Sequence, residues 1–276
     1  MRKIRRPLRS VFYYLFVVLV IAFFGLPLLW LILAPFNSDV SLAVEIPANP
    51  TLDNFQMVFQ NKFAVQALTK NNIIIAFGTM LGVTLISSLT AYALSRARIP
   101  GRNAMAYTLM LFSSVVTGTA AMVPIFLIIS SMGLIDTYLG VILVLIGGNL
   151  PSAIFMMRNF VDEIPASYEE SAIVSGASPL QVFLDVAVPQ VRPGMMVIAV
   201  WSFVNAWGAY LTPMILLRSP DKLPASTAIY SFYTEAGTPN IKLVSAYSLL
   251  YLLPVVVFYL LVNRKYGFQF FGGIKR

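Results

Sequence analysis

Six stretches of the sequence contain no Asp, Glu, Lys or Arg, and each is at least as long as the ~20 residues that an α-helix needs to cross the hydrocarbon of a bilayer. They are residues 10–38, 71–95, 103–135, 137–157, 193–217 and 243–263. The next longest uncharged run, residues 171–184, has only 14 residues. The sequence therefore predicts six membrane spans, at about residues 11–35, 71–95, 104–130, 137–158, 194–217 and 243–263.

The spans are apolar on all sides and lack the alternation of a lipid-embedded β-strand. In hydrocarbon every backbone amide must be paired within its own segment, which a helix achieves. Hydrophobic residues make up 58% of the chain and charged residues only 11%, far below the roughly 25% that is usual in soluble domains. Since neither an internal repeat nor a soluble domain is visible, the prediction is an all-α, polytopic integral membrane protein with one transmembrane domain, residues 1–276.

The basic residues predict the orientation of the chain. If the N-terminus lies in the cytoplasm, 14 of the 19 Lys and Arg residues fall on the cytoplasmic side, as the positive-inside rule expects. Residues 1–9 are basic and an apolar run follows, but that run is too long for a secretory signal. We therefore expect a retained first span in a bacterial plasma (inner) membrane, with both termini cytoplasmic.

Several function classes are disfavoured. The chain has no Cys and no His, which removes thiolate chemistry and the commonest general base and metal ligand. Its net charge of +8 comes from residues at the ends of apolar stretches, where lipid head groups explain them better than nucleic acid does. A phosphate-binding Gly-x-x-x-x-Gly-Lys-Ser/Thr loop is missing, so any ATP must be bound by another chain.

The loop between the fourth and fifth windows, residues 159–192, has its own helix signals. Ser167 and Glu170 fit a capping box, which predicts a helix that begins at Tyr168. Gly176 suits the left-handed residue after a helix end, and Ser178 followed by Pro179 predicts a second helix over residues 179–187.

Small residues gather at the turn between these two helices, which allows another surface to approach the backbone closely. They are Ser171, Ala172, Ser175, Gly176 and Ala177. Helix signals alone are equally compatible with a helical hairpin that lies on the lipid surface.

The same loop resembles a known family. The permease subunits of ATP-binding-cassette importers carry Glu-Ala-Ala, three residues, Gly, nine residues and Ile-x-Leu-Pro, the EAA motif. Here Glu170-Ser171-Ala172, Gly176 and Val186-x-Val188-Pro189 stand at that spacing. The likeness extends to residues 50–55, to Asn71-Asn72 and to the Gly-rich tail at residues 271–275, and it looks like the second of the two permeases in carbohydrate importers.

The resemblance implies a type I importer fold with a cytoplasmic helix-turn-helix coupling segment, residues 159–192, seated on an ATPase. It implies a non-catalytic subunit that translocates a sugar or a related solute. Its partners would be a second permease, two ATP-binding subunits that hold the ATP and Mg, and an extracytoplasmic solute-binding protein. The residues expected to carry the coupling are Ser167, Glu169, Glu170, Ser171, Ala172, Gly176, Ala177, Pro179 and Pro189.

Within the windows, neutral amides and aromatic rings are the groups that a sugar pathway would use. The candidates are Asn149, Asn205, Trp207 and Tyr210. The same residue types also join helices and anchor spans at the membrane interface. The alternative function is a secondary transporter driven by an ion gradient, which the absence of ionisable residues from the windows disfavours.

Overall fold

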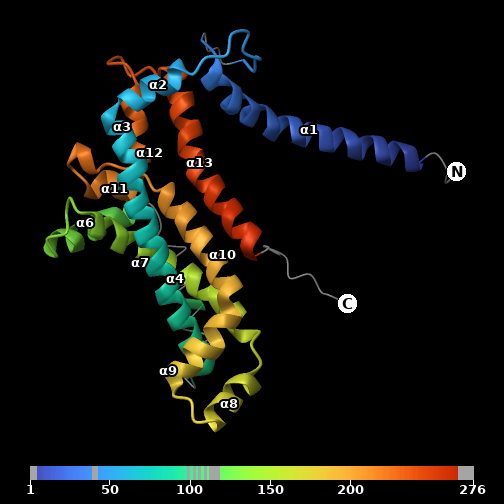
Figure 1. Ribbon diagram of the computed structural model, residues 1–276, viewed down its shortest axis with the longest axis vertical. Helices are drawn as coiled ribbons and strands as arrows, with labels where there is room; N and C mark the ends of the chain where they lie inside the picture. The colour runs from blue at the N-terminus through green and yellow to red at the C-terminus, as the bar shows by residue number, and fades with distance from the viewer. Residues whose placement is uncertain are drawn as a thin grey trace. The chain divides into compact units, whose positions relative to one another are not determined.

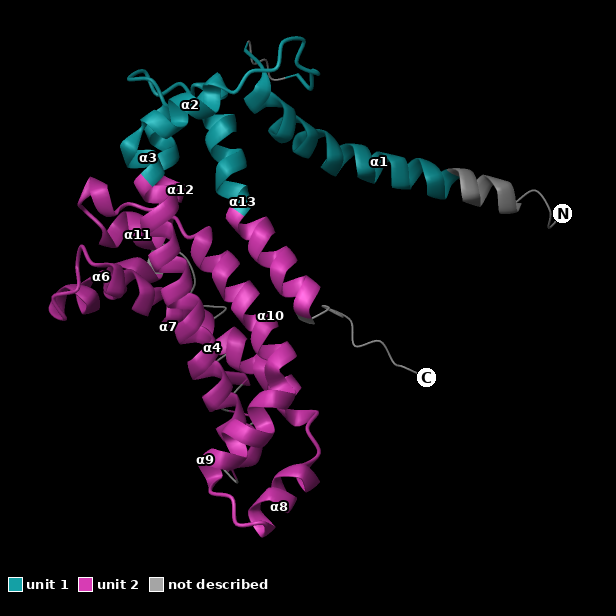
Figure 2. Ribbon diagram, in the orientation of Figure 1, with its two compact units in different colours: residues 1–65, 228–253 teal, residues 66–227, 254–276 magenta. Residues whose placement is uncertain are grey.

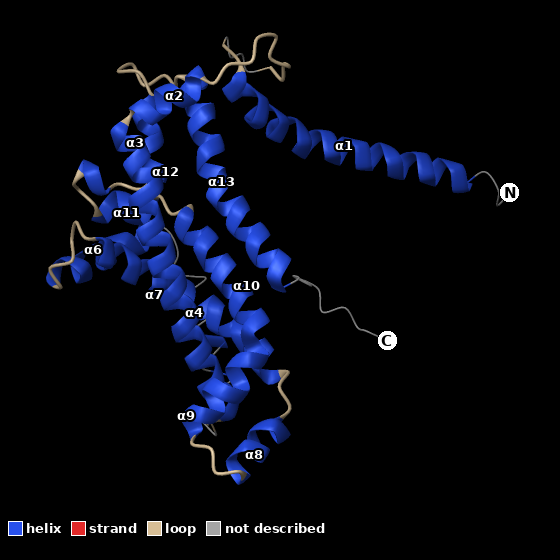
Figure 3. Ribbon diagram, viewed as in Figure 1, coloured by secondary structure: helices blue, strands red, loops and turns tan. Residues whose placement is uncertain are grey.

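The computed structural model describes residues 5–38, 43–97 and 119–266, together with positions 100, 101, 104, 107, 108 and 111. Helices dominate all the described ranges (Figures 1 and 3). Within those ranges β-pairing is limited to two isolated bridges, Asn37 with Pro50 and Tyr233 with Pro239. The predicted all-α class is confirmed.

Five helical segments among the described residues are long and apolar enough to cross a bilayer. They are Phe12–Phe36, Lys62–Arg96, Tyr138–Asp162, Pro179–Trp207 and Ile241–Lys265. Each includes or overlaps one of the predicted spans, because a run without charges can place its side chains in lipid at every helical position.

The remaining predicted span, residues 104–130, is described only in part, since positions 105, 106, 109, 110 and 112–118 lie outside the described residues. Its described part is α6 (Thr119–Ser131), a shorter apolar helix. The count of six spans therefore stays a prediction.

The chain divides into two compact units, coloured separately in Figure 2. One comprises residues 1–65 and 228–253, and the other comprises residues 66–227 and 254–276. The boundaries fall within α3 (Lys62–Gln66), α12 (Ala225–Ala228) and α13 (Ile241–Tyr266).

The first unit contains α1 (Arg5–Leu33), a 3-10 turn (η1, Ala34–Phe36) and α2 (Asp53–Gln60). The apolar window of α1 has no buried residues, as expected of a helix surrounded by lipid. The buried Asn54 of α2 donates hydrogen bonds to the carbonyls of Pro35 and Asn37, at 2.9 and 3.0 Å. The short helix α2 is thereby fixed to the end of α1 and η1.

The first unit also includes residues 228–253, made of the short helix η5 (Ile229–Phe232), a turn and the first half of α13. Phe232 packs against Tyr247 of α13, with 5.3 Å between ring centroids. Ser231 accepts a hydrogen bond from Asn61, which follows α2, at 3.1 Å. The hydrogen bond joins residues 228–253 to the N-terminal part of the unit.

In the second unit, α4 (Asn72–Arg96), α7 (Tyr138–Asp162) and α10 (Val188–Trp207) pack on one another. Their shared core includes Val83, Met157, Val161 and Ile198, all almost fully buried. A Cβ built on Gly82 of α4 would lie 2.3 Å from Ile146, and one built on Gly194 of α10 would lie 2.4 Å from Phe160. Glycine thus allows these helices to approach closely.

The helix that overlaps the predicted fifth span, residues 194–217, has other bounds than that span. The chain is helical without a break from Pro179 to Trp207, through α9 (Pro179–Gln181), a π-helical turn (η3, Val182–Ala187) and α10. The helix then ends at Gly208, and α11 (Leu211–Leu216) follows separately. The helix therefore extends well before residue 194, because Asp185, Gln190 and Arg192 interrupt the apolar run without interrupting the helix. The bounds of the span itself stay a prediction.

Candidate functional site

The segment of residues 166–189, here called the α8–α9 segment, is a helix, a turn and a second helix, as predicted. Its first helix, α8 (Ala166–Val174), begins two residues before Tyr168. Pro165 is the N-cap residue, its carbonyl accepts a hydrogen bond from the Tyr168 amide at 3.2 Å, and no side chain caps this end. The predicted capping box of Ser167 is therefore wrong, because the extended backbone of Pro165 starts the helix and places Ser167 inside the first turn.

The turn after α8 is a Schellman motif. The Ala177 amide donates to the Ala172 carbonyl at 3.0 Å, and the Gly176 amide donates to the Ile173 carbonyl at 2.9 Å. Gly176 has a φ of 90°, a conformation that disfavours residues with a Cβ. The predicted left-handed glycine is confirmed, and a Cβ built there would meet nothing within 4 Å.

The second helix of the segment begins at the predicted place. Ser178 is the N-cap residue of α9, and its hydroxyl accepts from the Gln181 amide while the Gln181 side chain accepts from the Ser178 amide. This reciprocal pair satisfies two amides that a helix start leaves unpaired. The predicted separate helix over residues 179–187 is wrong in one respect, since it continues into α10 and Pro189 stands in the first turn of α10.

Large apolar side chains are exposed along the segment. Tyr168, Ile173 and Val174 of α8 are 58–89% exposed, and Leu180 and Leu184 follow at 64% and 50%. Nearly all of the coupling residues predicted from the sequence are also exposed or partly exposed: Ser167, Glu170, Ser171, Ala172, Gly176, Ala177, Pro179 and Pro189. The exception is Glu169, which is only 6% exposed and turns into the protein.

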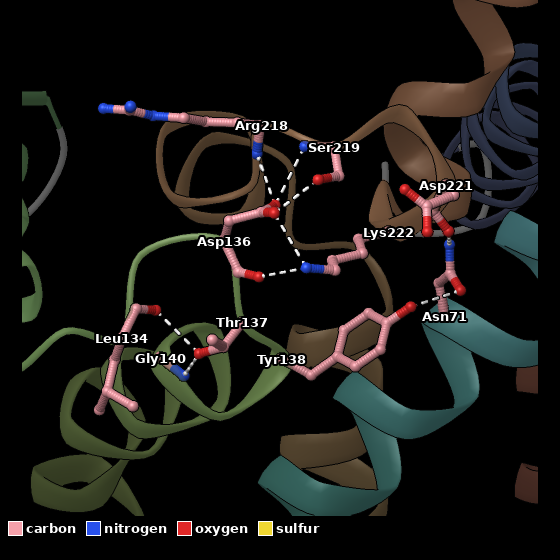
Figure 4. A network of polar contacts seen from close by, with 10 residues as sticks. All are labelled: Asn71, Leu134, Asp136, Thr137, Tyr138, Gly140, Arg218, Ser219, Asp221 and Lys222. Atoms are coloured by element: carbon pink, nitrogen blue, oxygen red, sulfur yellow. Dashed lines mark hydrogen bonds and ion pairs between the residues drawn. The ribbon is translucent and has the colours of Figure 1, made fainter.

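The same unit also contains a polar cluster, made of Asp136, Arg218, Ser219 and Lys222 and here called the Asp136 cluster (Figure 4). The Asp136 carboxylate accepts from the backbone amides of Arg218 and Ser219, both at 3.0 Å, and from the Ser219 hydroxyl at 2.5 Å. Lys222 Nζ lies 2.9 Å from the same carboxylate. Sequence reasoning missed this cluster, which fixes the loop after α11 to the turn before α7.

Asn71 extends the connection to α4. Its amide nitrogen donates to the carbonyls of Asp221 and Leu223, both at 2.8 Å, and its amide oxygen accepts from the Tyr138 hydroxyl at 2.8 Å. In Figure 4 the Asn71 side chain lies between Tyr138 and the backbone of Asp221. One buried side chain thus joins the N-terminal ends of α4 and α7 to the loop after α11.

The environment of the Asp136 cluster stabilises its charges. Hydrogen bonds from Ser219, Lys222 and Arg218 hold the pKa of the Asp136 carboxyl well below its usual range. The hydrogen bond with Asp136 in turn raises the pKa of Lys222. Both groups are therefore charged throughout the neutral range.

Comparison with known proteins identifies the chain. Residues 5–268 match the family of binding-protein-dependent transport system inner membrane components. The chain belongs to this family. The resemblance drawn from the EAA motif is confirmed, and this inner membrane component is a multi-pass membrane protein.

Relatives of this inner membrane component cover nearly its whole length. It is 30% identical to the galactooligosaccharides transport system permease protein GanQ of Bacillus subtilis, over 96% of this chain and 94% of the relative. It is 31% identical to the trehalose transport system permease protein SugB of Mycobacterium tuberculosis, over 93% of this chain and 94% of the relative. A chain of a bacterial importer of the acidic polysaccharide alginate shares the fold, with a TM-score of 0.82 and 22% identity over 97% of this chain and 99% of the other.

The pathway candidates of this inner membrane component occupy different environments. Asn149 of α7 is partly buried and Asn205 of α10 is exposed, and each donates to a carbonyl one turn earlier in its own helix, at 2.7 and 2.8 Å. Tyr210, just before α11, is 36% exposed, whereas Trp207 is 2% exposed and stacks on Phe203 with 5.4 Å between ring centroids. Trp207 is thus packed in the helix core, and Asn205 and Tyr210 are the accessible candidates.

The α8–α9 segment has the features of a binding surface. Among the residues that the structure describes, no three Asp or Glu side chains gather where they could hold a metal ion. The α8–α9 segment instead offers exposed apolar side chains on a firmly capped turn, which suits contact with another protein.

Proposed function

We propose that this chain is the translocating permease subunit of a sugar importer that is driven by ATP hydrolysis on separate subunits. The observation that carries the proposal is the exposed apolar surface of the α8–α9 segment, which stands at the spacing of the EAA motif. The transport of galactooligosaccharides and trehalose named for two relatives supports a sugar as the solute.

In the proposed mechanism the α8–α9 segment docks on an ATP-binding subunit. Ile173, Val174 and Leu180 would lose their exposed apolar surface to that partner, which is favourable in proportion to the area removed from water. Closure of two such ATP-binding subunits would then displace the segments and open the pathway toward the other side of the membrane.

The proposal assigns both termini and the α8–α9 segment to the cytoplasm, in keeping with the distribution of Lys and Arg. The loop between α11 and α13 would then face the extracytoplasmic binding protein that delivers the solute. The second permease would form the pathway together with this chain, and Asn205 and Tyr210 are available to line it.

The test compares two substitutions at Gly176. Both Gly176→Ala and Gly176→Leu impose a Cβ on a φ of 90°, so the two variants share the same backbone strain. Only the leucine adds bulk, and it does so where the chain itself leaves open space. We expect Gly176→Leu to lose the ATP-binding subunits during purification and to lose sugar uptake, while Gly176→Ala retains most of both.

The control is Gly133→Leu, which has the same kind of strain, with a φ of 69°, in the turn before α7. It should leave retention of the ATP-binding subunits unchanged. Normal uptake by Gly176→Leu would refute the docking assignment. Uptake by the purified chain alone, driven by an ion gradient in vesicles that contain no ATPase, would favour the secondary transporter instead.

A further inference from the structure

Arg96, the last residue of α4, lies at the centre of a polar cluster that the proposed docking surface does not include. Its Nε lies 2.8 and 3.0 Å from the two carboxylate oxygens of Glu169 in α8. Its Nη2 donates to the carbonyls of Val161 and Ile164 at the end of α7, at 3.2 and 2.9 Å. Its Nη1 donates to the Ser95 hydroxyl at 3.1 Å. All three guanidinium nitrogens are thus engaged, and they connect α4, α7 and α8.

Glu169 is held from a second direction. The Tyr92 hydroxyl, one turn before Arg96 in α4, donates to the Glu169 carboxylate at 3.2 Å. The side chains of Arg96 and Glu169 are 24% and 8% exposed, respectively. The neighbouring Glu170 is exposed, so the two adjacent carboxylates of α8 point in different directions.

We propose that Arg96 and Glu169 are a positioning pair that makes the docking helix α8 move as one body with α4 and α7. The inference rests on the proposed function, because it says how a displacement of the docking segment reaches the spans. Glu169 then acts inside this chain and not as a contact for the ATP-binding subunit, the role that its place beside the EAA motif suggests.

The chemistry of the guanidinium explains why an arginine stands here. Arg96 donates to the carbonyl of Val161 in the last turn of α7 and to that of Ile164 just after this helix, while it neutralises the carboxylate of α8. A lysine supplies one flexible ammonium group, which cannot hold both sets of acceptors in a fixed geometry. The pair is also sensitive to loss of one member, because the other would lose its oppositely charged partner while it stays largely buried and keeps only neutral hydrogen-bond partners.

The other end of α4 shows where the movement would arrive. A π-helical turn (η2, Ala67–Asn71) leads directly into α4, and Asn71 is bonded to the loop after α11. The Asp136 cluster fixes the same loop to the start of α7. A displacement of α8 would therefore be transmitted along α4 and α7 to this loop, at the opposite end of the same unit.

The first experiment measures amide hydrogen exchange in α8 of the purified full chain. Arg96→Gln and Glu169→Gln should each speed exchange over residues 166–174 by roughly tenfold, since loss of a charge-assisted hydrogen bond has that magnitude. If the two residues act as a pair, the double variant exchanges no faster than the faster single variant. Arg96→Lys should resemble Arg96→Gln, and Glu163→Gln, which alters an exposed carboxylate three residues before α8, is the control that leaves exchange unchanged.

The second experiment measures sugar uptake per ATP hydrolysed by the reconstituted complex. We expect Arg96→Gln and Glu169→Gln to keep their ATP-binding subunits but to lower this ratio by roughly fivefold or more. A smaller folded fraction would lower both rates together and leave the ratio unchanged, so the ratio separates positioning from a simple loss of stability.

The outcomes separate this inference from the proposed function. Unchanged exchange in α8, additive effects in the double variant, or a normal uptake ratio would each overturn the pair. Loss of the ATP-binding subunits from Glu169→Gln but not from Arg96→Gln would also overturn it, in favour of a direct contact by Glu169. If the unaltered chain never binds ATP-binding subunits, the proposed function fails, while the exchange experiment still tests whether the pair holds α8.

Discussion

Replacement of Gly194 by alanine tests the packing of α10 on α7. A Cβ at this position would lie 2.4, 2.6 and 2.9 Å from Cγ, Cδ2 and Cβ of Phe160. These atoms are the root of the Phe160 side chain and not its flexible end, so a change of rotamer cannot move all of them away. Because ordinary van der Waals contact begins near 3.4 Å, the two helices must separate locally by about 1 Å.

The expected cost combines two opposing effects. Overpacking of a tightly packed site costs about 1 to 3 kcal/mol, and three contacts shorter than 3.0 Å place this site in the upper part of that range. Alanine is favoured over glycine in a helix by about 1 kcal/mol. We therefore expect Gly194→Ala to destabilise the folded chain by about 1 to 2 kcal/mol.

Gly147→Ala in α7 is the matched control, because a Cβ there meets nothing within 4 Å. It keeps the gain in helix preference without the clash. The difference in unfolding free energy between the two variants therefore isolates the steric cost, about 2 to 3 kcal/mol. The assay is SDS-driven unfolding of the purified chain in mixed micelles, followed by tryptophan fluorescence, since Trp201 and Trp207 both lie in α10.

A double-mutant cycle with Phe160→Ala tests whether the cost of Gly194→Ala comes from the Phe160 side chain. That variant removes the two nearest ring atoms and leaves only the Cβ contact of 2.9 Å, so Gly194→Ala should cost much less in its background. An equal cost of Gly194→Ala with and without the Phe160 ring would show that the close approach of α10 and α7 is not what the glycine serves.

Three further predictions concern the α8–α9 segment and the Asp136 cluster with Asn71. Ser178→Ala removes the cap of α9 and should destabilise this helix start by about 1 kcal/mol, seen as faster amide exchange over residues 179–182, whereas Ser178→Asp should restore protection. Asn71→Ala leaves the Tyr138 hydroxyl and two carbonyls without their partner and should lower stability by about 2 to 3 kcal/mol, measured by the same SDS titration. Because the pKa of Asp136 is lowered on folding, its contribution is present above the ordinary carboxyl pKa of about 3.9 and is lost as the pH falls through the lowered value. The difference in melting temperature between the unaltered chain and Asp136→Asn should therefore be constant from pH 5 to pH 8 and should shrink only below about pH 4, and a steady change across neutral pH would contradict the assignment.

Much of the fold could be predicted from the sequence, because the bilayer leaves few choices. In the bilayer a run of some 20 residues without charge must be helical to pair its own amides. This single constraint located the five long apolar helices among the described residues. It could not place the start of the helix that contains the predicted fifth span, since a helix can pass through Asp185 and Arg192 without ending.

Local signals predicted some caps and not others. Ser178 is followed by a proline that already has the φ of a helix, and the cap predicted there is present. Ser167 has a glutamate at the right spacing, but Pro165 starts the helix before it. A serine three positions before a glutamate therefore predicts an N-cap only where no earlier residue, such as Pro165, already starts the helix.

The polar clusters could not be predicted, because they join residues far apart in the sequence. Arg96 and Glu169 are separated by 73 positions and Asp136 and Lys222 by 86. Either of the adjacent residues Glu169 and Glu170 could have faced inward, and only the position of Arg96 decides between them. The one available signal was that Arg96 and Glu169 both fall on the predicted cytoplasmic side.

The unbroken helix from Pro179 to Trp207 has a geometric consequence. Its 29 residues make a rod about 43 Å long at 1.5 Å per residue, whereas the hydrocarbon is roughly 30 Å thick. If Trp207 marks one edge of the hydrocarbon, the first nine residues of the rod, which include Asp185, extend about 13 Å beyond the opposite edge. Ser178 precedes the outer end of this rod. When the rod tilts, the turn at Ser178 therefore moves sideways farther than any residue of the same helix within the bilayer.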